Sequence, residues 1–127
     1  MRIVPFESVG EVKFSASRKD IIAILGKPDQ EVDNSIGLHE LKYRNTTYRF
    51  DKTGALEEIT AHAPVLDLGT ISVPFPALAT YIHQQDHSAF TKAGFLVSPH
   101  FGLAFDPDCP PWVTVITKLS IDLWLAV

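Results

Sequence analysis

A short helix with clear start and stop signals, within residues 17–29, constrains the fold of this chain most. Ser17 can cap the helix by accepting a hydrogen bond from a backbone N–H, and Asp20 can complete a capping box three residues later. Gly26 and Pro28 end the helix, because glycine tolerates the backbone angles of a C-cap and proline cannot continue an α-helix. The sequence therefore predicts a helix of about eight residues here.

An apolar stripe on this predicted helix requires a surface to cover it. Ile21, Ile24 and Leu25 have the i, i+3, i+4 spacing of one helix face, and Ile22 widens that face. A helix this short is not stable alone in water. We therefore expect the helix to lie against a β-sheet formed by other parts of the chain.

The remainder of the first half predicts an antiparallel meander that follows the helix. Alternating residues predict a short strand or an extended lead-in to the helix at 9–14, and a polar link at 30–37 comes after the helix. Three further alternating segments, at 38–44, 47–51 and 55–62, are separated by short turns. This spacing is typical of antiparallel strands joined as hairpins.

The second half repeats this order of elements. A predicted strand at 68–73 is followed by a predicted helix at 75–85, whose apolar residues again have helical spacing. Strands are then predicted at 94–97, 102–106 and 112–118. Because the same elements recur in the same order, the pattern indicates a duplicated unit.

A last apolar segment, at 119–127, has no counterpart in the first half, and we expect it to form a strand that closes one edge of the sheet. The predicted fold class is α+β. A single domain spans residues 1–127, with half-repeats at 1–64 and 65–127. Two helix-plus-antiparallel-meander repeats form one continuous antiparallel sheet with the helices on one face, and the other face is at least partly open.

Charge and composition exclude several classes of partner. The net charge is −4, and residues 65–127 hold two Lys or Arg against five Asp or Glu. A nucleic acid partner is not expected, because phosphate binding requires clustered lysine and arginine. No apolar run is long enough for a signal peptide or a membrane span, and the single cysteine cannot form an internal disulfide. These features predict a cytoplasmic protein without a membrane partner.

Three histidines of the second half form a candidate metal or ligand site. His83 and His87 lie four residues apart, and a third metal ligand would have to come from His39, His62 or His100 through the tertiary fold. This spacing matches no recognised metal motif, so solvated or capping histidines are the favoured interpretation. No phosphate-binding loop, dinucleotide fingerprint or nucleophile motif occurs in the sequence. We therefore expect no metal, no cofactor and no enzymatic activity.

Alternation along the predicted strands places charged and aromatic residues on one face of the sheet. If the apolar residues face the helices, the intervening residues share the opposite face, which is charged in the first half and aromatic in the second. Trp and Arg dominate protein-binding hot spots, so we expect this face to bind a protein, although tryptophans are also common in cores. The candidate partner-binding residues are Lys42, Arg44, Arg49, Glu58, Trp112 and Trp124.

The predicted helix carries the spacing Thr/Ser-x₃-Val-x₃-Leu-Gly-x-Pro-Asp, and a Phe-Asp-x-x-Gly turn follows at residues 50–54. Over about residues 9–62 the chain thereby resembles the small outer-membrane assembly lipoproteins and related domains with the fold of the β-lactamase inhibitor protein family. Ser15 and Ala16 stand where those families have Gly-Met, and the lipobox cysteine is missing, which argues against membrane anchoring. The residues that carry the resemblance are Ser17, Ile21, Leu25, Gly26, Pro28 and Asp29.

This resemblance implies a tandem-repeat binding module whose sheet grips another protein. The expected function is that of an immunity protein or inhibitor, which neutralises a bacterial toxin or enzyme by occluding it with the sheet face. One alternative is a small enzyme or a ligand- or metal-binding protein with a pocket lined by His83, His87 and His100. Another is a structural adaptor that forms a homodimer through an exposed strand at 119–127.

Overall fold

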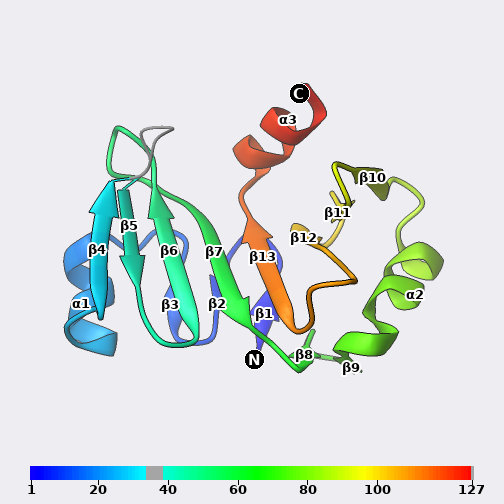
Figure 1. The fold of residues 1–127 in the computed structure, drawn as a ribbon, viewed down its shortest axis with the longest axis horizontal. Coiled ribbons are helices and arrows are strands. Elements are labelled where there is room, and N and C mark those ends of the chain that lie inside the picture. Colours follow the sequence, from blue (N-terminus) through cyan, green and yellow to red (C-terminus); the bar gives the residue numbers. More distant parts are fainter. Residues whose placement is uncertain (34–38, 127) are drawn as a thin grey trace.

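The computed structural model describes residues 1–33 and 39–126 and shows an α+β fold (Figure 1). Its largest element is an antiparallel sheet of eight strands in the order β10-β11-β12-β13-β7-β6-β5-β4. One meander from each half of the chain contributes to the sheet, and the two meet where β7 pairs with β13. The strands are β4 (Gln30–Asp33), β5 (His39–Lys42), β6 (Thr46–Phe50), β7 (Leu56–His62), β10 (Phe90–Lys92), β11 (Phe95–Ser98), β12 (Leu103–Phe105) and β13 (Trp112–Ile116).

Two smaller sheets and three helices complete the described part of the chain. The first small sheet contains β1 (Ile3–Val4), β2 (Ser8–Val9) and β3 (Val12–Lys13), and the second contains β8 (Val65–Asp67) and β9 (Ser72–Pro74). The helices are α1 (Arg18–Leu25), α2 (Phe75–Gln85) and α3 (Lys118–Ala126). None of these three described helices has the length and apolar character needed to cross a membrane.

Helix α1 confirms the predicted capping box. The Ser17 N–H donates to Asp20 Oδ2 at 2.9 Å, and the Asp20 N–H donates to Ser17 Oγ at 3.2 Å. The predicted apolar stripe is wrong in part, because Ile21 is buried whereas Ile24 and Leu25 are exposed. Helix α1 lies behind β4 at the edge of the sheet (Figure 1), where only one side of a helix can meet the core.

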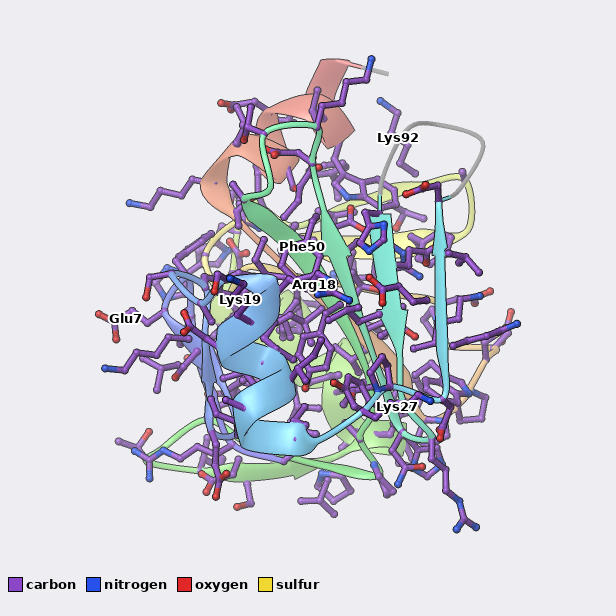
Figure 2. The ribbon with its side chains drawn as sticks, turned by 90° about the vertical axis from the view of Figure 1, so that its left-hand side faces the viewer. Glu7, Arg18, Lys19, Lys27, Phe50 and Lys92 are labelled. Atoms are coloured by element: carbon purple, nitrogen blue, oxygen red, sulfur yellow. The ribbon has the colours of Figure 1, made fainter. Side chains whose placement is uncertain are left out.

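The main core lies between the large sheet and helices α1 and α2. Leu41, Tyr48 and Ile59 are opposite one another on β5, β6 and β7, and all three are buried. Ile21 of α1 and Leu78 of α2 belong to the same buried cluster. Figure 2 shows α1 standing on one side of the sheet. The alternation of apolar residues therefore predicted correctly which face meets these two helices.

Two segments predicted as single strands are tight hairpins instead. Residues 8–13 form β2, a turn and β3, and residues 65–74 form β8, a turn and β9. Gly10 and Gly69 lie in these turns with positive φ angles of 57° and 95°. Positive φ is accessible to glycine and lets the chain reverse where a strand would continue. The predictions of one strand at 9–14 and one at 68–73 are therefore wrong.

The two outer strands of the large sheet are absent from the sequence-based prediction. Strand β4 occupies the start of the predicted link at 30–37, and β10 precedes the predicted strand at 94–97. Edge strands bury little of either face and so show weak hydrophobic alternation, which explains why the sequence does not reveal them. The rest of that link, and the first residue of the predicted strand at 38–44, lie outside the described residues.

The C-terminal segment forms helix α3, not the predicted edge strand. Thr117 caps it, because Thr117 Oγ1 accepts a hydrogen bond from the Ser120 N–H at 3.3 Å and its carbonyl accepts one from the Ile121 N–H at 3.1 Å. Ile121 and Trp124 are three residues apart and lie against one apolar cluster. The prediction of a closing strand at 119–127 is wrong, so a homodimer through that strand loses its basis.

Candidate protein-interaction surface

The face of the large sheet opposite α1 and α2 carries polar side chains over strands β5, β6, β7 and β13. In Figure 1, α1 and strands β1–β3 lie behind the sheet, so the viewer looks at this face. Neighbouring strands are about 4.8 Å apart, which lets side chains in one row contact each other. We call this region the open patch. Its rows, given by the strand register, are Glu40–Arg49–Glu58, Lys42–Thr47–Thr60–Thr114 and His62–Trp112.

Arg49 is the centre of the hydrogen bonding in the open patch. Its Nε donates to Glu40 Oε1 at 2.9 Å, and its Nη1 donates to Thr60 Oγ1 at 2.7 Å. Nη1 also lies 3.5 Å from Glu58 Oε2. The Thr60 hydroxyl is 2.9 Å from the Thr114 hydroxyl, so the network reaches β13. These contacts hold the guanidinium in one position, partly exposed on the sheet surface.

Two carboxylates flank this single guanidinium. Glu40 is buried, with 7% of its surface exposed, and Glu58 is partly buried. Burial raises the pKa of Glu58, and the nearby charge of Arg49 offsets part of that rise. Because both carboxylates are close to the single guanidinium of Arg49, its one positive charge compensates part of their negative charge within the patch.

The third row brings an aromatic group and a basic turn together. Trp112 is 41% exposed, and its ring meets the His62 ring edge-on with centroids 5.2 Å apart. The His62 N–H donates to the Asn45 carbonyl at 2.9 Å, which holds the β5–β6 turn beside β7. Arg44 is exposed in that turn. One end of the open patch therefore presents both a large apolar surface and cationic side chains.

The same face of the sheet continues into the second half as an apolar region that α3 covers. We call this region the covered patch and define it as Phe95, Val97, Ala104 and Ile116, which share the face of Thr114 by register. Ile121 and Trp124 of α3 pack on it, with the Trp124 and Phe95 ring centroids 5.5 Å apart. Lys92 Nζ donates to the Trp124 carbonyl at 2.7 Å and holds the end of the helix.

A side chain from the N-terminal region also supports the covered patch. Phe6 has a positive φ of 64° and packs against this cluster, with Lys118 Nζ 5.5 Å from its ring centroid. Gly102 leaves room for it, because a Cβ on Gly102 would lie 3.1 Å from the Phe6 ring. The ring therefore occupies space that any larger residue at position 102 would take.

The six predicted partner-binding residues fall into two groups. Four of them, Lys42, Arg49, Glu58 and Trp112, belong to the open patch, and Arg44 lies in the adjoining turn. Trp124 does not lie on an exposed strand, because it is half-buried on α3 against Phe95. Thr60 and Thr114 were not predicted. Only the tertiary pairing of β7 with β13 brings their hydroxyls together.

The three histidines of the alternative site are all exposed on the surface of the second half. The nearby buried group is Asp86, which ends α2 and is 5% exposed. Its carboxylate accepts hydrogen bonds from the Ser98 hydroxyl at 2.6 Å, from the His100 N–H at 3.1 Å and from Ser88. Burial alone would raise the pKa of Asp86, but these hydrogen bonds outweigh it and lower the pKa.

In this arrangement Asp86 ties the end of α2 to the segment that follows β11. Among the described residues, no group of three or more His, Cys, Asp or Glu side chains is arranged to hold a metal ion.

A charged cluster holds α1 to the sheet edge in the first half. Arg18 donates two hydrogen bonds to the Glu31 carboxylate, at 2.6 and 2.7 Å. His39 lies between Glu31, at 2.6 Å, and Asp33, at 2.7 Å. Hydrogen bonds from Arg18 and His39 lower the pKa of Glu31 from 4.5 to about 2, and Asp33 and Glu31 raise the pKa of His39.

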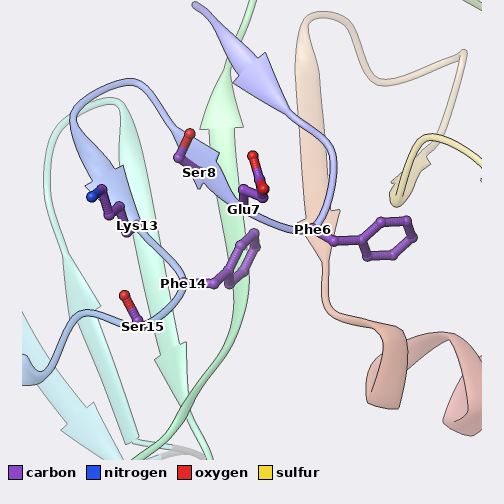
Figure 3. A pocket seen from close by; sticks show the side chains of 6 residues that line it. All are labelled: Phe6, Glu7, Ser8, Lys13, Phe14 and Ser15. Atoms are coloured by element: carbon purple, nitrogen blue, oxygen red, sulfur yellow. The ribbon is translucent and has the colours of Figure 1, made fainter.

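A cavity of about 410 Å³ lies on the N-terminal hairpin, away from the open patch. Figure 3 shows that its lining side chains come from the loop before β2 and from β2, β3 and the residues after them. Glu7, Lys13 and Ser15 in this lining are exposed, so the cavity is a surface hollow. None of the predicted site residues contributes to it.

Comparison with protein-family models, with curated proteins and with solved structures found no match to this chain. The resemblance carried by the helix signature therefore stays a prediction.

Proposed function

We propose that this protein is a binding module that neutralises a target protein, as an inhibitor or immunity protein does, by occluding it with the open patch. The observation that supports this proposal best is that the fixed Arg49 row and the exposed Trp112 lie on the same face of the sheet, with the Lys42–Thr47–Thr60–Thr114 row between them. Arg and Trp are the side chains most enriched among binding hot spots. Occlusion requires no reaction by this chain, so the proposed function is not enzymatic.

Preorganisation of the open patch favours binding over a purely structural role. A flexible arginine loses rotamer freedom when it binds a partner, which weakens the complex. Arg49 is already held by Glu40 and Thr60, so this cost falls on folding and not on association. Trp112 adds apolar area that a partner can bury.

We also propose that the two halves derive from duplication of one helix-plus-meander unit. Helix α1 precedes β4–β7, and helix α2 precedes β10–β13. Both four-stranded units are antiparallel meanders, and their last strands, β7 and β13, pair with each other. The class of target, a bacterial toxin or enzyme, follows from the family resemblance alone.

Affinity capture from a lysate that contains the products of neighbouring genes tests this function. Wild-type protein should retain one partner stoichiometrically, and Trp112→Ala should weaken its binding by about 2 kcal/mol or more, as expected for a hot-spot tryptophan. Leu123→Ala is the matched control, because Leu123 is an exposed apolar residue on α3, away from the open patch.

The capture experiment has a clear negative outcome. Equal binding by wild type and Trp112→Ala would contradict the use of the open patch, and recovery of no partner by the wild type would contradict the binding function itself. For a toxin partner, co-expression of this chain should restore growth of the cells that make the toxin.

A further inference from the structure

We infer that the partner presents an acidic protein surface, which places carboxylates at Lys42 and Arg44 and an apolar side chain against Trp112. This inference rests on the proposed binding function and specifies the chemistry of the partner. The observation behind it is that the carboxylates of the open patch are paired with Arg49, whereas the neighbouring cations are not paired with them.

The two carboxylates of the open patch, Glu40 and Glu58, already interact with Arg49. Glu40 Oε1 accepts from Arg49 at 2.9 Å, and Glu58 Oε2 lies 3.5 Å from the same guanidinium. A basic side chain from a partner would therefore compete with Arg49 for both carboxylates. Such competition would leave a partly buried arginine without its ion pairs, which is unfavourable.

The basic groups beside them have no such partner in the part of the chain that the structure describes. Among the described residues, the ion pairs on this face join Arg49 to Glu40 and Glu58, and they include neither Lys42 nor Arg44. Lys42 is half-buried and Arg44 is exposed. The patch thus presents cations to its surroundings, although the whole chain carries a net charge of −4. Its local charge complements a carboxylate surface.

The strand register places these cations next to the exposed tryptophan. Lys42 shares a row with Thr114 across β5, β6, β7 and β13, and Trp112 lies two residues from Thr114 on β13. The turn that carries Arg44 is tied to His62, which is paired with Trp112. Cationic and apolar contacts are therefore available at one end of the patch to a single segment of a partner.

Phosphate groups of a nucleic acid fit this surface less well than carboxylates of a protein. Tight phosphate binding uses many clustered cations, whereas the described residues at this end of the patch include two, Lys42 and Arg44, outside its ion pairs. The net negative charge of the chain would also repel a polyanion over a longer range. A protein segment with a few carboxylates and one apolar side chain matches the cations and the exposed tryptophan of this surface.

Selection from a phage-displayed library of random peptides tests this inference. Wild-type protein should enrich peptides that are rich in Asp and Glu and contain an aromatic or aliphatic residue. The variant K42E/R44E should lose this preference, with at least about tenfold weaker binding of the selected peptides, because rim charges of the wrong sign are repulsive. K42Q/R44Q should weaken binding less than the reversal does.

The matched control is K13E/K19E, which makes the same change of charge at two exposed lysines of β3 and α1, elements that lie on the other side of the sheet (Figure 1). This control should bind the selected peptides as the wild type does, and thermal melting should show that all variants fold. Enrichment without acidic residues, no enrichment, or equal binding by K42E/R44E would overturn the inference.

Tighter binding of a single-stranded DNA oligonucleotide, lost in K42E/R44E, would also overturn the inference, because the partner would then be a nucleic acid. Failure of the inference is distinct from failure of the proposed function. A partner whose capture depends on Trp112 but not on Lys42 and Arg44 would leave the binding function intact.

Discussion

Arg49 and Thr60 on β6 and β7 lie on the same face of the large sheet as Ala104 and Ile116 on β12 and β13, but the two regions meet different surroundings. The open patch stays uncovered because its polar side chains bond to one another. The covered patch is apolar and is packed under Ile121 and Trp124 of α3. An apolar surface left in water favours association with other molecules. The comparison indicates that α3 shields the apolar covered patch from other molecules and leaves the polar open patch accessible to a partner.

Charged groups are also used differently in the two halves. In the first half, Arg18, Glu31 and His39 form an ion-pair chain at the exposed edge of the sheet. In the second half, the buried carboxylate of Asp86 is satisfied by hydroxyl and backbone donors. Exposed ion pairs contribute little to stability, whereas a buried network that loses one member is strongly destabilised. The Asp86 network is therefore expected to be more sensitive to single substitutions than the Arg18–Glu31–His39 chain.

Asp86→Ala should have the largest effect on stability. It removes the acceptor of the buried Ser98 hydroxyl and of the His100 N–H, and we expect a loss of about 3 kcal/mol in the free energy of unfolding. Urea denaturation measures this loss. Asp106→Ala is the control, because Asp106 accepts a turn hydrogen bond from the Asp108 N–H at a less buried site and should cost below about 1 kcal/mol. Equal losses would remove the contrast between buried and surface carboxylates.

Ile121→Ala should uncover part of the covered patch. The Ile121 side chain is 8% exposed, and we expect the free energy of unfolding to fall by about 2 kcal/mol. This value is at the lower end of the range for buried Ile→Ala substitutions, because α3 lies at the periphery of the fold. Binding of a hydrophobic dye should rise at the same time. Leu123→Ala on the exposed side of α3 should change stability by less than about 0.5 kcal/mol. Unchanged stability in Ile121→Ala would show that α3 does not hold this surface.

Arg49→Met should show how much the central cation of the open patch contributes to the stability of the fold. Glu40 and Glu58 would lose their compensating charge, and we expect a loss of about 1.5 kcal/mol at pH 7. The loss should shrink at acidic pH, because protonation removes the charges that Arg49 balances. Arg44→Met, at an exposed position, should stay within about 0.5 kcal/mol of wild type. A loss that does not depend on pH would point to packing of the Arg49 side chain.

Glu31→Gln should have the smallest effect, and one that depends on pH. The pKa of Glu31 is lowered from 4.5 to about 2 in the folded protein. The stabilisation of the fold by the ionised Glu31 side chain is therefore fully present above pH 4.5 and is lost as the pH falls toward 2. Melting temperatures of the variant and wild type should therefore differ at neutral pH and converge over that range. Glu11→Gln, an exposed carboxylate on the N-terminal hairpin, controls for the general effect of acid. A difference that persists at pH 2 would contradict the lowered pKa.

Local signals in the sequence were sufficient to predict helix α1 and strands β5, β6 and β7. The capping box of Ser17 and Asp20 lies within one turn of helix, and the alternation through β5, β6 and β7 reflects one buried and one polar face. The same alternation predicted that Arg49 and Glu58 share a face. Such features depend on neighbours along the chain, so periodicity and capping rules can detect them.

Features that depend on distant contacts were not predictable. An apolar segment such as 119–126 fits a strand or a helix, and only its packing on the covered patch selects the helix for Ile121 and Trp124. The hydroxyl contact between Thr60 and Thr114 requires the pairing of β7 with β13. The hairpin at Gly10 could not be predicted from the alternating sequence, because the alternation does not show that this glycine adopts a positive φ angle.

The two tryptophans allow a direct test of which patch binds the partner, because Trp112 lies on the open patch and Trp124 of α3 packs on the covered patch. Acrylamide quenching of the single-tryptophan variants Trp124→Phe and Trp112→Phe would be measured with and without the captured partner. We expect the partner to protect Trp112 from quenching and to leave Trp124 unchanged. Protection of Trp124 alone, with Trp112 still fully accessible, would show that the partner binds elsewhere than the open patch.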